Sequence, residues 1–197
     1  PGDAPGGVVV SAGFDKLVKV WDLGSRRVVR TLHGHTDLVW SAKLSADART
    51  VVSCSSDRTL RVWDVERGLC RGVLEGHELE VICCSLRLDG WLCLTTSLDM
   101  TCCLWDLRVM NQRTKLILHT DSPTTCALSQ DGRVIISGAL DGTLVAYNTS
   151  LVFRLLIKTP SDGREEWDIT VEVLLDPDDS IDALCEQLQR KLSDREV

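Results

Sequence analysis

Long apolar runs, metal-ligand spacings and phosphate-binding loops are all missing from this sequence of 197 residues. No stretch approaches the roughly 18 consecutive apolar residues of a membrane span, so no contact with a membrane is expected. The first residues, PGDAPGG, lack a basic region followed by an apolar run, so we expect a linker over residues 1–7 and no signal peptide. No CxxC pair stands near histidines, and no Gly-rich phosphate loop or paired carboxylates with a neighbouring base occur. We therefore expect no metal and no cofactor.

The net charge of −7 is confined to one end of the chain. Residues 1–157 hold 17 Lys+Arg and 17 Asp+Glu, whereas residues 158–197 hold 5 and 12. A neutral body with an acidic tail argues against nucleic acid as a partner, because proteins that bind it carry a basic patch. The shift in composition also marks a domain boundary near residue 158.

The chain has many cysteines, and their number is odd. Most of them stand in apolar stretches such as VICCSL and TCCLW, which is typical of small buried hydrophobes in a reducing compartment. Disulfides and nucleophiles are the less favoured interpretations. We expect a cytoplasmic protein, with the nucleus left open as an alternative. The nine cysteines are Cys54, Cys70, Cys83, Cys84, Cys93, Cys102, Cys103, Cys126 and Cys185.

A repeat with a period of 42 residues runs through the first four-fifths of the chain. A Trp-Asp pair recurs with this spacing, and the fourth copy is replaced by the similar pair Tyr-Asn. The four pairs are Trp21-Asp22, Trp63-Asp64, Trp105-Asp106 and Tyr147-Asn148. An aspartate stands six residues before each aromatic residue, at Asp15, Asp57, Asp99 and Asp141. Gly-His pairs and Ser or Thr hydroxyls keep the same register, so several independent positions define one repeat.

The segments SAGFDKLVKVWD, SCSSDRTLRVWD, TTSLDMTCCLWD and SGALDGTLVAYN carry these positions, and they resemble the WD-repeat β-propeller family over residues 8–158. The resemblance implies an all-β fold, a partial WD-repeat β-propeller of about four blades. VVVSAG, LVKVWDL and RRVVRTL are then strands b, c and d of the first blade, which lacks strand a. DLVWSAKLS becomes strand a of the second blade.

In this family a His, a hydroxyl, an Asp and a Trp of each blade form one buried hydrogen-bonded chain. Three sets match in this sequence: His35, Ser53, Asp57 and Trp63; His77, Thr95, Asp99 and Trp105; His119, Ser137, Asp141 and Tyr147. A tyrosine lacks the indole donor, so we expect the fourth blade to be the least rigid. His, Ser and Asp also build hydrolase triads, but recurrence at the blade period favours a structural role.

The resemblance also places a partner-binding rim at one end of the blades, where the b–c turns and the d–a loops meet. Function in such a scaffold lies on its loops. Ser56 and Glu80 are polar positions of this rim. Apolar side chains there have no core to fill, so their clustering suggests a partner surface, although any single one could pack under a neighbouring loop. The candidates are Phe14, Leu38, Trp40, Ile82, Leu98 and Leu140.

The number of blades is small for a closed ring, since propellers have about four to eight blades and this family most often seven. An incomplete ring exposes apolar blade faces and strand edges. We therefore expect a fragment or a shortened isoform of a longer propeller. A dimer that completes the ring is the less favoured alternative.

The acidic tail, residues 159–197, departs from the repeat. ITVEVLL, then DPDD, then SIDALCEQLQRKL predict a strand, a turn and an amphipathic helix whose apolar positions are Ile181, Leu184, Cys185, Leu188 and Leu192. With LLIKT before it, the tail resembles the first half of a ubiquitin-like β-grasp, a partial β-β-α segment. The expected fold thus has a small appendage of one β-strand and one α-helix. Alternatively, the tail strand closes the ring against the first blade.

The stretch LVFRLLIKTP, residues 151–160, fits both parts of the chain. It aligns with strand d of the first blade, and also with the first strand of a ubiquitin-like domain. We expect residues 152–158 to pair with strand c of the fourth blade, which is close in sequence, and we treat the two pairings as exclusive.

The function expected from these features is a non-catalytic protein-protein interaction scaffold whose partners are other proteins. The first alternative is a ubiquitin-pathway adaptor or substrate receptor that contacts ubiquitin-system components through the tail. The second is a hydrolase that uses one His–Ser–Asp set. Of the three, only the last is an enzyme, and the repetition of the set counts against it.

Overall fold

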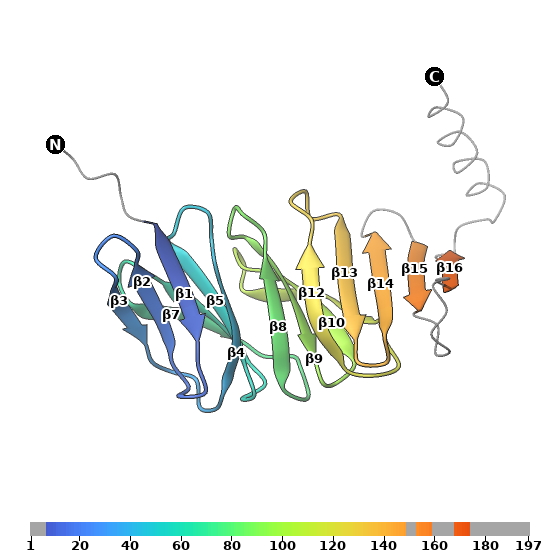
Figure 1. Ribbon diagram of the computed structural model, residues 1–197, viewed down its shortest axis with the longest axis horizontal. Coiled ribbons are helices and arrows are strands. Elements are labelled where there is room, and N and C mark those ends of the chain that lie inside the picture. Colours follow the sequence, from blue (N-terminus) through green and yellow to red (C-terminus); the bar gives the residue numbers. More distant parts are fainter. Residues whose placement is uncertain (1–6, 149–152, 159–167, 174–197) are drawn as a thin grey trace, which may run out of the picture.

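Four antiparallel sheets stand side by side in chain order in the computed structural model (Figure 1), which describes residues 7–148, 153–158 and 168–173. All regular elements in these ranges are β-strands, which confirms the all-β prediction for them. Blade 1 has three strands and blade 2 has four: β1 (Val8–Ala12), β2 (Val18–Asp22) and β3 (Arg27–Leu32); β4 (Val39–Leu44), β5 (Thr50–Ser55), β6 (Leu60–Asp64) and β7 (Leu69–Leu74).

Blade 3 has four strands, and the sheet of blade 4 has five: β8 (Val81–Leu86), β9 (Leu92–Ser97), β10 (Thr101–Asp106) and β11 (Asn111–Ile117); β12 (Pro123–Leu128), β13 (Val134–Ala139), β14 (Thr143–Asn148), β15 (Phe153–Lys158) and β16 (Asp168–Val173). The first strands of successive blades are neighbours, with β4 against β8 and β8 against β12. Blade 1 begins with strand b, and this strand, β1, lies against β4 as β5 lies against β8.

The repeat fixes the b–c turns through one aspartate per blade. The Asp57 carboxylate accepts a hydrogen bond from the Thr59 amide two residues later (3.0 Å), and Asp99 does the same for the Thr101 amide (3.0 Å). This local bond is why Asp suits a tight turn. Each turn also holds a residue in the left-handed region, which L side chains rarely adopt. These residues lie one period apart, at Lys16, Arg58, Met100 and Gly142.

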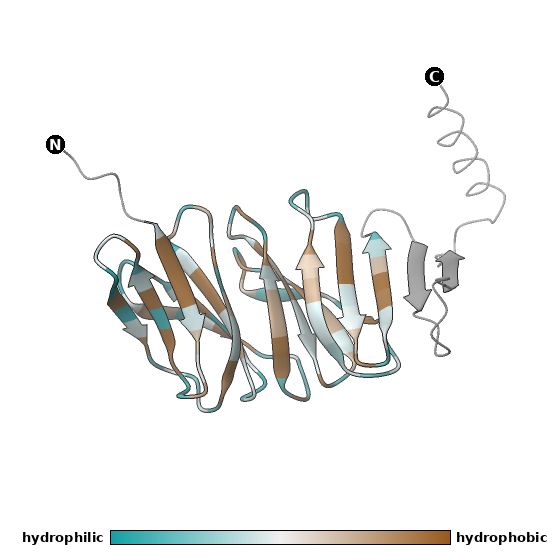
Figure 2. Ribbon diagram, in the orientation of Figure 1, coloured by the Kyte–Doolittle hydropathy of each residue, from teal (hydrophilic) through white to brown (hydrophobic). Residues whose placement is uncertain are grey.

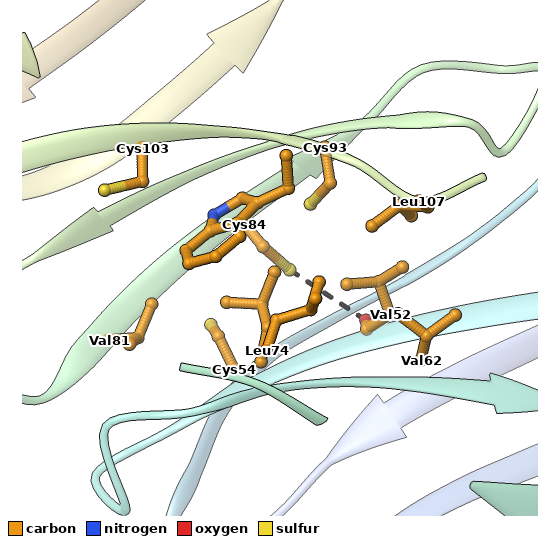
Figure 3. Close-up of a cluster of buried hydrophobic side chains, with 11 residues drawn as sticks. Val52, Cys54, Val62, Leu74, Val81, Cys84, Cys93, Cys103 and Leu107 are labelled. Carbon is orange, nitrogen blue, oxygen red and sulfur yellow. Dashed lines mark hydrogen bonds between the residues drawn. The ribbon is translucent and has the colours of Figure 1, made fainter. Parts of the chain in front are cut away.

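The hydrophobic cores lie between the blades. Side chains of a strand point alternately to opposite faces, so β6 sends Trp63 to the cluster shared with blade 1 and Val62 to the cluster shared with blade 3. Figure 2 shows hydrophobic stretches on strands such as β1, β8 and β13. Figure 3 shows the cluster between blades 2 and 3, in which Cys54, Cys84 and Cys93 are buried among aliphatic side chains.

Strand β15 pairs on both of its edges. Its residues pair with β14 in the register Leu155↔Ala146, and with β16 in the register Leu155↔Val171. The expectation that these two pairings exclude each other was therefore wrong, because a strand has two edges that can bind different neighbours. The fourth sheet continues past residue 158, where the sequence predicted the repeats to end. The predicted helix of the tail lies outside the described residues.

The row of blades is open in this structure. Blade 1 and β16 lie at opposite ends of the row (Figure 1), so the alternative in which the tail strand closes the ring against blade 1 does not hold. Apolar side chains are exposed on both end blades: Val9 is 44% exposed on β1, and Ile136 is 39% exposed on β13.

Candidate functional site: buried hydrogen-bond chains and an apolar rim

The first complete chain of hydrogen bonds links four side chains of blade 2. Trp63 Nε1 donates to Ser53 Oγ (2.8 Å), and His35 Nε2 lies 2.7 Å from the same oxygen. His35 Nδ1 lies 2.7 Å from Asp57 Oδ2. The four residues come from the loop before β4, from β5, from the b–c turn and from β6, so the chain links the d–a loop to strands b and c.

The direction of each proton in this chain follows from the donors available. The ionised Asp57 carboxylate can only accept, so His35 carries its proton on Nδ1 and donates it to Asp57. His35 Nε2 is then an acceptor, and the Ser53 hydroxyl, whose oxygen accepts from the Trp63 indole, donates to it. A neutral imidazole with each nitrogen satisfied is stable when buried, and His35 is only 7% exposed.

Blade 3 repeats the arrangement with a threonine in place of the serine. Trp105 Nε1 donates to Thr95 Oγ1 (2.7 Å), which lies 2.8 Å from His77 Nε2. His77 Nδ1 lies 2.9 Å from Asp99 Oδ2. The structure thus brings together every predicted member of the first two sets.

Blade 4 keeps the inner part of the chain and changes its end. His119 Nε2 lies 2.7 Å from Ser137 Oγ, and His119 Nδ1 lies 3.1 Å from Thr143 Oγ1, which donates to Asp141 Oδ1 (2.6 Å). A tyrosine, Tyr147, stands where the other blades hold the indole, and it packs in the apolar cluster between blades 3 and 4. In blade 1 the corresponding indole-to-hydroxyl bond is present, from Trp21 Nε1 to Ser11 Oγ (2.9 Å).

Sequence reasoning missed three threonines that hold the aspartates. Thr59 Oγ1 donates to Asp57 Oδ1 (2.7 Å), and Thr101 and Thr143 make the same bond to their own aspartates (both 2.6 Å). The signal was present, because DRT, DMT and DGT keep the 42-residue period.

The glycine of the Gly-His pairs leaves room for the indole ring. A Cβ on Gly34 would lie 3.0 Å from Trp63 Cη2, and a Cβ on Gly76 would lie 3.0 Å from Trp105 Cη2. The next position in register is Leu118, which is 3% exposed and belongs to the same cluster as Tyr147. A larger residue therefore accompanies the smaller aromatic ring in blade 4.

Burial and hydrogen bonding have opposite effects on the pKa values of the histidines and aspartates in these hydrogen-bond chains. Burial lowers the pKa of His35 and of His77, outweighing the nearby Asp57 and Asp99 carboxylates, which act to raise it. Burial acts to raise the pKa of Asp99, but hydrogen bonds from Thr101, the Glu78 amide and His77 bring it down to about 2. The chains therefore consist of a neutral imidazole and an ionised carboxylate at neutral pH.

A hydrolase triad has the same connectivity, from hydroxyl to imidazole to carboxylate. In these blades the hydroxyl residues Ser53, Thr95 and Ser137 have no exposed surface. The indoles of Trp63 and Trp105 donate to two of these oxygens and so occupy lone pairs that a nucleophile would need. The geometry therefore supports a structural role for the three sets.

An aromatic pair lies in the predicted rim, at blades 1 and 2. The rings of Phe14, in the b–c turn of blade 1, and Trp40, on β4, meet edge to face with centroids 5.5 Å apart. Phe14 is 68% exposed and Trp40 is 39% exposed, so the pair faces solvent. Such a pair offers a large apolar surface with a fixed shape.

Polar residues of the next turns hold the indole of Trp40 in place. Trp40 Nε1 donates to Ser56 Oγ (2.7 Å), and Ser56 Oγ donates to Glu80 Oε2 (2.6 Å). Glu80 Oε2 also lies 3.3 Å from Trp40 Nε1. Phe14, Trp40 with Ser56, and Glu80 belong to blades 1, 2 and 3, so this rim cluster spans three blades.

The remaining rim candidates differ in exposure. Leu140 is 70% exposed in the b–c turn of blade 4, whereas Leu38, Ile82 and Leu98 are half-buried. Backbone hydrogen bonds join the b–c turn of a blade to the d–a loop that precedes it. The Ser56 amide donates to the Leu38 carbonyl (2.9 Å), and the Leu140 amide donates to the Ser122 carbonyl (3.1 Å). The structure shows no contact between Leu140 and the aromatic pair.

The residues that the structure describes form neither a metal cluster nor a membrane-spanning helix. Among those residues, no group of three or more His, Cys, Asp or Glu side chains is placed to hold a metal ion. Within the same ranges, no helix is long and apolar enough to cross a membrane.

Blades 2 and 3 are four-stranded sheets that each hold a complete His, hydroxyl, Asp and Trp chain, as the blades of a WD-repeat propeller do. The model of the WD domain, G-beta repeat, matches residues 26–64, 68–106 and 110–148, which together are more than half of the chain. The chain therefore belongs to the WD40 family.

A short segment is also similar to a curated protein, mitochondrial division protein 1 of Neurospora crassa. The two are 56% identical over 34 residues, which is 17% of this chain and 5% of that protein. The chain therefore matches only a small part of that relative's length. The similarity supports the repeat and says nothing of what the two proteins bind.

Proposed function

We propose that this chain is a non-catalytic scaffold that binds other proteins through the rim formed by Phe14, Leu38, Trp40, Ile82, Leu98 and Leu140. WD40 repeats indicate an interaction scaffold. The rim cluster is the observation that supports this face of the blades as the binding surface. Trp40 is exposed to solvent, yet its indole is bonded to Ser56 and contacts Phe14. A rigid aromatic side chain loses little conformational entropy when a partner covers it, which is why Trp is common at binding hot spots.

The experiment is affinity capture from a cell extract with the immobilised chain, followed by quantitative mass spectrometry. Phe14→Glu with Trp40→Glu should abolish capture of the proteins that bind the rim, because a carboxylate would be buried in the apolar contact. Val109→Glu is the matched control. Val109 is 70% exposed, but it lies in a c–d turn at the opposite end of the blades.

The folded state should survive both sets of changes. Substitution of exposed residues usually changes the free energy of unfolding by about 0.5 kcal/mol or less, and loss of the Trp40 bond adds about 1 kcal/mol. Thermal unfolding of the three proteins checks this. If the double variant captures the same proteins as the wild type, the rim is not the binding surface.

A second candidate function is a ubiquitin-pathway adaptor, and the pairing of β15 with β16 favours it. The two strands are antiparallel neighbours, with Ile157 opposite Ile169, as in the first hairpin of a β-grasp. Deletion of residues 160–197 should then remove captured ubiquitin-system components. Deletion of residues 174–197 alone keeps β16 in place, so it separates the loss of the tail from damage to the sheet of blade 4. Unchanged capture after both deletions would exclude the adaptor role.

The cysteines bear on the compartment. Eight cysteines in the described part of the chain are free thiols, including neighbours such as Cys83 and Cys84. Free thiols persist in reducing compartments. We therefore propose a cytoplasmic location, and imaging of the tagged chain in cells tests it.

A further inference from the structure

A cavity of about 400 Å³ lies between blades 3 and 4, at the opposite end of the sheets from the rim. Antiparallel strands place the a–b and c–d turns at this end, and the cavity is lined by residues of the a–b turns of both blades. Its volume lies within the roughly 300–1,000 Å³ range of small-molecule sites. No part of the proposed function uses this cavity.

The floor of the cavity is apolar. It is formed by side chains of the cluster between the two blades, with Tyr147 beside them. These floor residues are Leu92, Leu104, Leu116, Ile135 and Tyr147. Leu92, Leu104 and Ile135 are buried, so the half-buried Leu116 and Tyr147 offer the part of this floor that an apolar group of a ligand can cover.

The mouth of the cavity is cationic. Arg87, Arg113 and Arg133 line it, whereas the one carboxylate among the lining residues that the structure describes is Asp131. The Asp131 carboxylate accepts bonds within its own turn, from Ser129 Oγ and from the Arg133 amide. Arg87 is held by Asp89, to which its Nε and one terminal nitrogen donate.

The free side of Arg87 is kept open by a glycine. A Cβ on Gly132 would lie 3.1 Å from the Arg87 Nη1 and 2.9 Å from a Leu92 methyl, so any other residue would fill this corner. Gly132 also has a φ of +74°, which a side chain would disfavour. The turn thus brings backbone close to the arginine without covering it.

The junction between blades 2 and 3 differs in both features, although Arg71 stands there in the place of Arg113. One period earlier, Ser45 and Trp91 stand where this cavity has Arg87 and Arg133. Met110 fills the space beside Gly72, with its sulfur 3.3 Å from the place of a Cβ. Arg87, Arg133 and the open space beside Thr114 therefore distinguish the junction of blades 3 and 4 from that of blades 2 and 3.

We propose that this cavity binds a small amphipathic organic anion, whose carboxylate is held by the arginines at the mouth and whose apolar body lies on the floor. Guanidinium groups bind carboxylates through paired hydrogen bonds, which gives the anion both affinity and orientation. The carboxylate could belong to a free small molecule or to the C-terminus of a peptide that ends in an aromatic residue, since both present the same chemistry.

The test is isothermal titration of the 197-residue chain with 3-phenylpropionate, with its neutral amide and with inorganic phosphate. We expect the carboxylate to bind at least about tenfold more tightly than the amide, since one charge-assisted hydrogen bond is worth roughly that factor, and more tightly than phosphate, which has no apolar body. A peptide Gly-Gly-Gly-Phe with a free C-terminus forms a further arm. Tighter binding of the peptide identifies a chain end as the natural source, and tighter binding of 3-phenylpropionate identifies a free molecule.

Matched variants locate the site. Arg113→Gln with Arg133→Gln should weaken carboxylate binding tenfold or more, and Thr114→Phe should block the cavity from its half-buried wall. Arg67→Gln, on an exposed turn of blade 2, should bind as the wild type does, and so should the rim variant with Phe14→Glu and Trp40→Glu. Equal binding of acid and amide, or full binding by both cavity variants with an unchanged unfolding temperature, would overturn the proposal.

Discussion

The junction between blades 2 and 3 and the junction between blades 3 and 4 are built from the same repeat and filled in different ways. The first holds Trp105, which is 1% exposed and donates to Thr95, and it has a glycine, Gly76, against the indole ring. The second holds Tyr147, which is half-buried, with Leu118 in place of the glycine. The repeat specifies which positions face the junction, and the size of the side chains decides how tightly each one closes.

The backbone differs at the same place. The pairing of β10 with β11 shifts register between Leu104 and Trp105, as it does before Trp63 in blade 2. The pairing of β14 with β15 continues through Tyr147 without a shift. A β-bulge redirects the strand locally and re-aims a side chain, so the bulge and the indole belong together.

The largest expected difference between the junctions comes from removing each aromatic side chain. Trp105→Ala should lower the free energy of unfolding by about 3–5 kcal/mol, because it leaves a cavity and frees the Thr95 hydroxyl. Tyr147→Ala should cost clearly less, about 1–2 kcal/mol, since the ring is only half-buried. Urea unfolding of both variants measures the difference, and equal losses would show that the two junctions are equally tight.

A second prediction exchanges the residues that distinguish the junctions. Tyr147→Trp alone should cost about 1–3 kcal/mol, because the indole would press on Leu118. Adding Leu118→Gly should recover part of that loss, with a coupling of about 1 kcal/mol or more between the two positions. A double-mutant cycle with both single variants provides the measurement. Additive effects would mean that the two side chains do not compete for the same space.

A third prediction concerns acid. His35 and His77 have pKa values below the ordinary 6.5, so the unfolded chain binds more protons and stability should fall as pH drops through about 6.5. Asp99 has its pKa lowered from 3.8 to about 2, so its contribution is present above pH 3.8 and is lost between there and about pH 2. Asp99→Asn removes this ionisable group and should flatten the stability profile between pH 3.8 and 2. A profile as steep as that of the wild type would contradict the assignment.

The smallest expected difference between the two junctions is in the reactivity of their cysteines, and it does not affect the stability of the fold. A hydrogen bond from Cys126 lowers the pKa of the half-buried Cys83, near the looser junction, to about 7. Cys54 and Cys93 are fully buried in the tighter junction, and burial raises their pKa values. Brief alkylation with iodoacetamide should therefore modify Cys83 and the exposed Cys70 long before Cys54 and Cys93. Mass spectrometry of the peptides checks the order, and uniform labelling would count against it.

Much of the fold follows from the period of the sequence. The spacing of Asp, Trp and the hydroxyls gives the register of the blades, because each residue type satisfies one fixed need of the turn or the chain of bonds. The family model confirms the membership of the WD40 family, and the structure confirms an all-β fold for the residues that it describes.

Contacts between blades did not follow from the period. The bond from Trp40 through Ser56 to Glu80 depends on how adjacent blades are placed and on side-chain rotamers. The cavity beside Tyr147 depends on volumes at one junction. The second pairing of β15 depends on a strand edge that sequence patterns do not mark.

Backbone hydrogen exchange, resolved by strand, tests the central comparison most directly. The amides of β9 and β10 flank Trp105 in the tight junction, and those of β13 and β14 flank Tyr147 in the looser one. Because blade 3 has the complete chain of bonds from Trp105 to Asp99, its amides should exchange more slowly than the equivalent amides of blade 4. Equal protection of the two blades, or slower exchange in blade 4, would contradict the account.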